Sequence, residues 1–179
     1  QNGIPCAYLV DKTGRIAWIG HPGSIDPVLE KYVAGEWNTD AYAAEFKKQQ
    51  VMEQEMQAMM PLLMEATNTG NLDKALPAID KMIAKHPEMM EIKMMKFQLM
   101  LSNDQWAPKA YAVGEQILKA NWDDYQVLNG ISWEVLTGQM VKDRNLEFAM
   151  KAITRANELT KGEEPSVLDT MARAYFDMK

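Results

Sequence analysis

The apolar residues from about Thr39 to Lys179 recur at helical spacing, and this period restricts most of the chain to α-helices. Tyr42, Phe46 and Met52 form one stripe. A second stripe in the same run contains Met59, Leu62, Leu63 and Ala66. Pro61 stands where it would kink or divide this run, and Gly70 is a natural stop. The pattern predicts a mostly α fold of helices joined by short turns.

The first forty residues have a different pattern. "CAYLV" and "RIAWIG" are typical of strands, and the intervening "DKTG" has the composition of a tight turn, with Gly14 suited to positive φ. After "HPG", the run "SIDPVLEKYV" predicts one short helix that ends before Gly35. A hairpin with one helix buries too little apolar surface to be stable alone, so we expect it to pack on further structure.

Three helical segments resemble one another. They are "GNLDKALPAIDKMIAKHP", "WAPKAYAVGEQILKANW" and "NLEFAMKAITRANELT". Each has an alanine followed four residues later by an apolar or small residue. The marker alanines, Ala75, Ala110 and Ala149, are 35 and 39 residues apart. This spacing is near the roughly 34-residue period of the tetratricopeptide repeat, in which small residues let two helices approach.

The first segment resembles that repeat, with Gly70, Ala75 and Pro87 at its turn glycine, packing alanine and closing proline. The middle segment departs from it, because Trp122 stands in place of the proline. "PSVLDTMARAYFDMK" is similar to the first helix of a further repeat, on the spacing of Leu168, Met171, Ala172 and Tyr175. We therefore expect a TPR-like array of antiparallel helical hairpins. A non-repetitive helical bundle is the alternative.

Residues 2 to about 37 resemble the C-terminal half of thioredoxin-like proteins of the redoxin type. Gly3-Ile4-Pro5 is similar to the cis-proline segment of that family, "AYLVD" and "RIAWIG" to its last two strands, and "SIDPVLEKYV" to its last helix. The resemblance implies a partial thioredoxin-like fold and a thiol-disulfide oxidoreductase. It also implies that Ile4 would meet the substrate through its backbone, while Pro5 shields the reactive site.

The Cys-x-x-Cys motif of that family is absent from this chain. No catalytic residue is therefore predicted here, and the chain alone is expected to be inactive in thiol exchange. The missing motif would precede Gln1. Cys6, the one thiol, is either a functional group or a small buried strand residue, and burial is the commoner state of a free cysteine.

Composition excludes several other functions. A net charge of −6 and a pI near 5.0 argue against nucleic acid as a partner. No apolar run reaches the roughly 20 residues of a membrane-spanning helix. With one cysteine and two histidines, neither a metal site nor a cofactor is expected. His21 reads as an ordinary loop residue and His86 as a cap at a helix C-terminus.

Methionines and aromatic residues leave two interpretations open. The 15 methionines suit either helix packing or an adaptable peptide-binding groove, and their helical spacing favours packing. The same choice applies to the larger aromatic residues of the array. These residues are Trp106, Tyr111, Trp122, Tyr125 and Trp133. If they cluster on a concave face, they would form a recognition site, and if they are distributed between the helices, they belong to the core.

Together these patterns predict two domains, the C-terminal half of a thioredoxin-like domain at residues 1–38 and a TPR-like domain at residues 39–179. The predicted function is protein or peptide binding by the repeats within a thiol-disulfide oxidoreductase. The alternative is a non-enzymatic TPR-type scaffold with a β-hairpin cap. The exposed sheet edge expected of half a fold would also allow two copies of the chain to form a homodimer by strand exchange. The resemblance slightly favours an extracytoplasmic (periplasmic) location over a cytoplasmic one.

Overall fold

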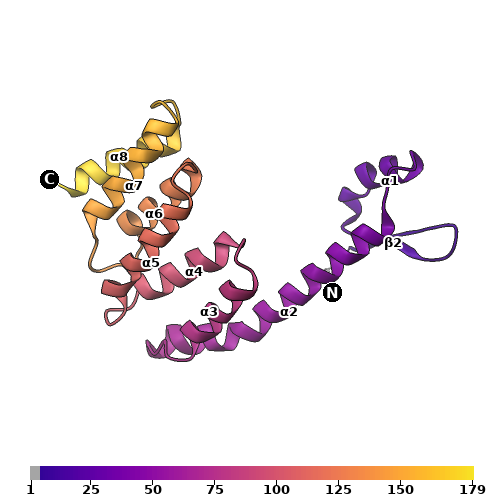
Figure 1. Cartoon of the computed structure of the whole chain (residues 1–179), viewed down its shortest axis with the longest axis horizontal. Coiled ribbons are helices and arrows are strands. Elements are labelled where there is room, and N and C mark those ends of the chain that lie inside the picture. Colours follow the sequence, from indigo (N-terminus) through magenta and orange to yellow (C-terminus); the bar gives the residue numbers. More distant parts are fainter. Residues whose placement is uncertain (1–4) are drawn as a thin grey trace. The chain divides into compact units, whose positions relative to one another are not determined.

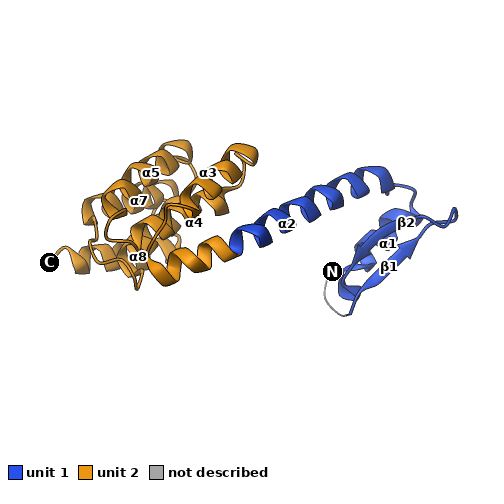
Figure 2. Ribbon diagram, turned by 90° about the horizontal axis from the view of Figure 1, so that it is seen from below, with its two compact units in different colours: residues 1–60 blue, residues 61–179 orange. Residues whose placement is uncertain are grey.

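The structure is a computed structural model in which residues 5–179 are described. Within them the fold is mostly α-helical, with eight α-helices and a single two-stranded antiparallel sheet, as the sequence pattern predicts (Figure 1). The chain divides into two compact units, residues 1–60 and residues 61–179 (Figure 2). Ile4 lies outside the described residues.

The first unit begins with the predicted hairpin, β1 (Ala7–Val10) and β2 (Ile16–Gly20). Its turn is organised by Asp11, whose Oδ1 accepts hydrogen bonds from the backbone N–H of Thr13 at 2.8 Å and of Arg15 at 2.9 Å. Gly14 takes a φ of +82°, a conformation that glycine adopts without a Cβ penalty. A short 3₁₀ turn (Pro22–Ser24) and α1 (Asp26–Val33) follow in the predicted order.

Two aromatic side chains bond to the backbone along β2. The Tyr42 hydroxyl donates to the carbonyl oxygen of Ile19 at 2.7 Å and accepts the Ile19 N–H at 3.1 Å. The indole Nε1–H of Trp37 donates to the carbonyl oxygen of Ala17 at 3.1 Å. Ile19 pairs in register with Tyr8. Because the N–H and carbonyl oxygen of Ile19 bond to Tyr42, they face away from β1. The side chains of Tyr42 and Trp37 therefore cover the outer edge of β2.

Helix α2 (Thr39–Thr69) runs from the first unit into the second and contains Pro61. The helix is not divided there, although a proline removes one backbone donor. The compact units separate between Met60 and Pro61. The predicted boundary after residue 38 lies at the start of α2, and the assignment of domains to residues 1–38 and 39–179 stays a prediction.

The second unit is a series of helices joined by short connections. They are α3 (Ala75–Lys85), α4 (Met90–Leu101), α5 (Ala107–Ala120), α6 (Tyr125–Thr137), α7 (Leu146–Leu159) and α8 (Pro165–Asp177). Each helix from α3 to α8 packs on the next one in the chain, and α8 also packs on α6. The most extensive helix pairing joins α6 to α7. Contacts between sequence neighbours are typical of helical-hairpin arrays.

Small residues set the close contacts of this array. Gly114 on α5 faces Phe97 and Phe148, and a Cβ at this position would lie 2.7 Å from Cζ of Phe148. Ser132 on α6 is fully buried, and its hydroxyl donates to the carbonyl oxygen of Ala149 on α7 at 3.0 Å. All three marker alanines, Ala75, Ala110 and Ala149, are fully buried. These small side chains therefore occupy buried positions of the array.

Candidate functional site

The residues assigned to a redox site by resemblance lie at the start of the hairpin. Pro5 is exposed, and Cys6 is half-buried immediately before β1. The Cys6 thiol lies 3.9 Å from the carbonyl oxygen of Ala7. A hydrogen bond with the Cys6 side chain raises the pKa of the Tyr8 phenol. This small polar contact contains no second thiol that could form an exchange pair with Cys6.

The two histidines occupy turn and cap positions. His21 is the N-cap of the 3₁₀ turn, where its Nδ1 accepts the Gly23 N–H at 3.1 Å. His86 is the buried C-cap residue of α3. Across residues 5–179, no cluster of three or more histidine, cysteine, aspartate or glutamate side chains has the geometry to hold a metal ion.

The methionines and aromatic residues do not gather on one surface. Met59, Met82 and Met100 are buried, whereas Met64 and Met140 are more than half exposed. Tyr111 packs edge-on against Phe148 with ring centroids 5.3 Å apart. Trp122, in the connection between α5 and α6, and Trp133, within α6, are both partly exposed. Trp122 and Tyr111 each line an open groove, and Trp106 lines a more enclosed concave site.

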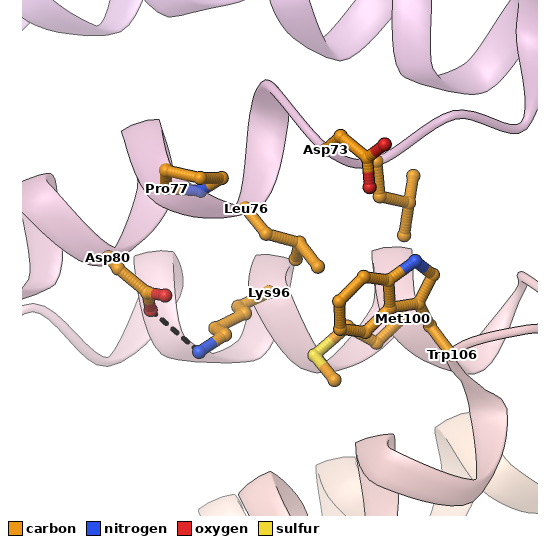
Figure 3. Close-up of a pocket in the computed structure, with 8 residues that line it drawn as sticks. Asp73, Leu76, Pro77, Asp80, Lys96, Met100 and Trp106 are labelled. Atoms are coloured by element: carbon orange, nitrogen blue, oxygen red, sulfur yellow. Dashed lines mark hydrogen bonds and ion pairs between the residues drawn. The ribbon is translucent and has the colours of Figure 1, made fainter.

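That site is a pocket of about 240 Å³ formed by α3, α4 and the start of α5 (Figure 3). The apolar walls come from Leu72, Leu76, Pro77, Met100 and the Trp106 ring. Its polar groups are at its two ends. In Figure 3, Asp73 lies beside Trp106, while Asp80 and Lys96 lie together at the opposite end.

Asn103 joins the two turns that bring Asp73 beside Trp106. Its side-chain Nδ2 donates to the carbonyl oxygen of Gly70 at 2.6 Å, and its Oδ1 accepts the Gln105 N–H at 3.1 Å. Gly70 has a φ of +71°, which lets the chain turn sharply after α2. The α2–α3 turn is thereby attached to the α4–α5 turn, 33 residues later in the sequence.

The charges at the two ends differ. Lys96 donates to Asp80 at 2.6 Å, and its side chain is only 18% exposed, so this carboxylate is neutralised within the protein. Among the described residues, no hydrogen bond or ion pair engages the Asp73 carboxylate or the Trp106 Nε1–H. Lys109 lies over the indole ring, 4.6 Å from its centroid. The Trp106 end of the pocket therefore keeps one anionic acceptor and one donor free for a ligand.

A second concave surface lies between α5 and α7 and is lined by Trp122, Leu118, Glu115 and Lys151, with a volume of about 600 Å³. Lys151 donates to Glu115 at 2.6 Å across this groove. Glu115, the one carboxylate among the described residues of this groove, is thus already paired, unlike the carboxylate of Asp73, whereas Lys119 also lines the groove.

Sequence reasoning identified only Trp106 of the pocket residues. Leu72 and Leu76 are four residues apart, as on one face of a helix, and this spacing indicates packing and not a site. Asp73 and Lys96 carry no local pattern that sets them apart from other surface charges. Their proximity to Trp106 depends on how the α2–α3 and α4–α5 turns meet.

In the described part of the chain, no helix is both long enough and apolar enough to span a membrane. No protein-family model matches this sequence. Neither a curated protein nor a solved structure matches it.

Proposed function

We propose that the chain is a protein-binding module whose helical hairpins form a TPR-like array, and that the pocket at Trp106 binds a segment of the partner. The observation that carries the proposal is the placement of an uncompensated carboxylate, Asp73, at the rim of an apolar pocket. An aliphatic side chain fits the apolar walls, and a neighbouring lysine or arginine of the partner would pair with Asp73. The net charge of −6 adds a weak attraction for a basic segment.

The experiment uses a phage-displayed library of random peptides, selected on the whole chain. The expected peptides combine an aliphatic residue with an adjacent Lys or Arg. Asp73→Asn should weaken their binding about tenfold, since a hydrogen bond to a charged group is worth about 1.5–3 kcal/mol. Trp106→Leu should weaken it further by removing the indole wall.

Glu163→Gln is the matched control, because Glu163 is an exposed carboxylate on the α7–α8 connection, away from the pocket. The proposal fails if no peptide is enriched, or if the enriched peptides bind Asp73→Asn and Trp106→Leu as tightly as the unchanged chain.

For the N-terminal segment we propose the closing part of a thioredoxin-like fold, within a protein that exchanges thiols and disulfides. The order of hairpin, short turn and helix in residues 7–33 favours this second candidate. Reduction of insulin disulfides by the natural gene product is its test, with the present chain as an inactive control because Cys6 has no partner cysteine. A gene product without a Cys-x-x-Cys motif would refute it.

A further inference from the structure

Two polar groups at the Trp106 end of the pocket have no partner within residues 5–179. One is the Asp73 carboxylate, a charged acceptor, and the other is the Nε1–H of Trp106, a donor. In Figure 3 the indole nitrogen lies on the edge of the ring that is directed toward Asp73. A ligand that satisfies both groups must therefore carry a cation and a hydrogen-bond acceptor close together.

The apolar part of the pocket has room for about one side chain. Its volume of about 240 Å³ is below the roughly 300–1,000 Å³ of sites that enclose a whole small molecule. Leu72, Leu76 and Met100 belong to the buried core, so packing fixes the shape of this wall. A single branched aliphatic side chain matches the pocket in size and polarity.

The opposite end of the pocket offers no free cation. Lys96 is paired with Asp80 at 2.6 Å, and its side chain is only 18% exposed. Lys109 lies over the Trp106 ring and is not one of the residues that line the pocket. A carboxylate in the pocket would therefore meet the negative charge of Asp73 without an unpaired cation to compensate it. These charges favour the amino end of a peptide over its carboxyl end.

The first residue of a polypeptide carries the three required groups on one Cα. Its α-amino group, with a pKa of about 7.7–8.0, is largely protonated near pH 7, and its carbonyl oxygen is an acceptor. The nitrogen and the carbonyl carbon are both bonded to the Cα that bears the side chain. An internal residue has a neutral N–H in place of the ammonium group, so its segment must supply the cation from a separate side chain.

We propose that the pocket binds best to the N-terminal residue of a polypeptide. An aliphatic side chain occupies the apolar part, the α-ammonium group pairs with Asp73, and the carbonyl oxygen accepts the Trp106 Nε1–H. This inference rests on the proposed peptide-binding function and specifies the part of the partner that binds most tightly. An internal segment with lysine or arginine is a weaker ligand, because ordering a long basic side chain costs more entropy.

The test compares three synthetic peptides that share a glycine-serine tail. The first begins with a free leucine, the second with a 4-methylpentanoyl group, which is leucine without its amino group, and the third with acetyl-leucine. Titration of the whole chain, followed by the ¹⁵N–H signal of the Trp106 indole, gives each affinity. The free-leucine peptide should bind at least about fivefold more tightly than the other two, because only it pairs with Asp73. Equal affinities would overturn the inference.

Substitutions assign the preference to the two polar groups. Asp73→Asn should reduce the preference for the free amino end to less than about twofold, whereas Glu163→Gln, at an exposed carboxylate, should keep it. Trp106→Phe retains an aromatic wall without the donor and should weaken binding of the free-leucine peptide about threefold, measured by calorimetry. Trp133→Phe, at a partly exposed tryptophan of α6, is its control. A full preference in Asp73→Asn would place the ammonium group elsewhere and refute the inference.

A fourth peptide separates this inference from the proposed function. It is blocked at both ends and contains leucine beside lysine in its interior. If it binds in an Asp73-dependent manner while the free-leucine and 4-methylpentanoyl peptides bind equally, the proposed function stands and the inference alone is wrong. If none of the four binds, both fail. Free leucine is the last probe, and binding as tight as that of the free-leucine peptide would assign the pocket to an amino acid instead of a polypeptide.

Discussion

Gly114 and Phe148 are in contact so close that a Cβ on Gly114 would lie 2.7 Å from Cζ of the Phe148 ring. The same added atom would lie 2.9 Å from Cε2 of Phe97, and both phenylalanines are buried. The absence of a side chain at residue 114 therefore lets α5 approach the aromatic rings of α4 and α7 together.

Replacing Gly114 by alanine is expected to destabilise the second unit. The helical preference of alanine contributes roughly 1 kcal/mol, but overpacking of two buried rings costs about 1–3 kcal/mol and should dominate. Gly130→Ala is the control, because Gly130 lies in α6 with no atom within 4 Å of an added Cβ. Chemical denaturation should show a loss for Gly114→Ala and a gain of about 0.5–1 kcal/mol for Gly130→Ala. Equal effects of the two substitutions would contradict the close contact.

Tyr111 links α5 to the connection between α6 and α7. Its hydroxyl donates to the carbonyl oxygen of Asp143 and accepts the Asn145 N–H, both at 2.9 Å. Tyr111→Phe should lower the free energy of unfolding by about 1–2 kcal/mol near neutral pH, because both bonds are lost. Tyr125→Phe, at a half-buried tyrosine, is the matched control.

The Tyr111 contribution should also depend on pH. Burial raises the pKa of the Tyr111 phenol above its ordinary value of 10.0, so folding favours the protonated form. Its stabilisation is fully present below pH 10 and is lost as the pH rises from 10 through the higher folded pKa. The difference between the unchanged chain and Tyr111→Phe should therefore shrink above pH 10, as denaturation at a series of pH values would measure. If this stability difference instead grew as the pH rose above 10, folding would not favour the protonated form of Tyr111.

The Asp11 carboxylate should make the hairpin turn sensitive to acid. The hydroxyl of Thr13, at 2.6 Å from Oδ1, and the backbone N–H of Arg15 hold the pKa of Asp11 below its ordinary value of 3.8. The stabilisation is present above pH 3.8 and is lost as the pH falls through the lower folded pKa. NMR of the Thr13 and Arg15 amides should show the turn opening in that range, and Asp11→Ala should open it at neutral pH. Asp169→Ala, at an exposed aspartate of α8, should leave these signals unchanged.

Tyr42 is expected to protect the outer edge of β2 from solvent. Tyr42→Phe removes both hydrogen bonds to the Ile19 backbone, so the Ile19 amide should exchange with solvent roughly tenfold faster, as expected for the loss of about 1.4 kcal/mol. Tyr32→Phe serves as the control within the same unit. Unchanged exchange in Tyr42→Phe would mean that the Ile19 N–H is protected by other means.

Local patterns predicted the elements of the fold well. The Asp11 to Gly14 turn, the short helix after Pro22 and the helical period from Thr39 each depend on neighbouring residues, and all are present in the structure. Pro61 is an exception, because its local effect does not end α2. Packing of neighbouring residues against the helix can offset the cost of one missing backbone bond.

The candidate sites depend on distant residues and could be predicted only in part. The spacing of Leu168, Ala172 and Tyr175 marked a packing face, but no pattern within α8 tells whether another helix covers it. Likewise, Trp106 was a candidate by residue type, whereas Asp73 joins it through the bond from Asn103 to Gly70. The residues of one helix determine which of its sides is apolar. Whether that side is exposed depends on how the other helices pack.

Because Tyr42 and Trp37 bond to the backbone of β2, a further strand can pair with this hairpin only along β1. A further strand cannot pair with β2 at these positions, since the N–H and carbonyl oxygen of Ile19 and the carbonyl oxygen of Ala17 already have side-chain partners. Along β1, Tyr8 and Val10 are more than half exposed, and the backbone of Tyr8 points away from β2 because its partner Ile19 does the same. In a larger sheet this hairpin would form the outermost pair of strands. Its β2 would then be an edge strand that cannot pair with the sheet of another molecule, which prevents edge-to-edge aggregation on that side.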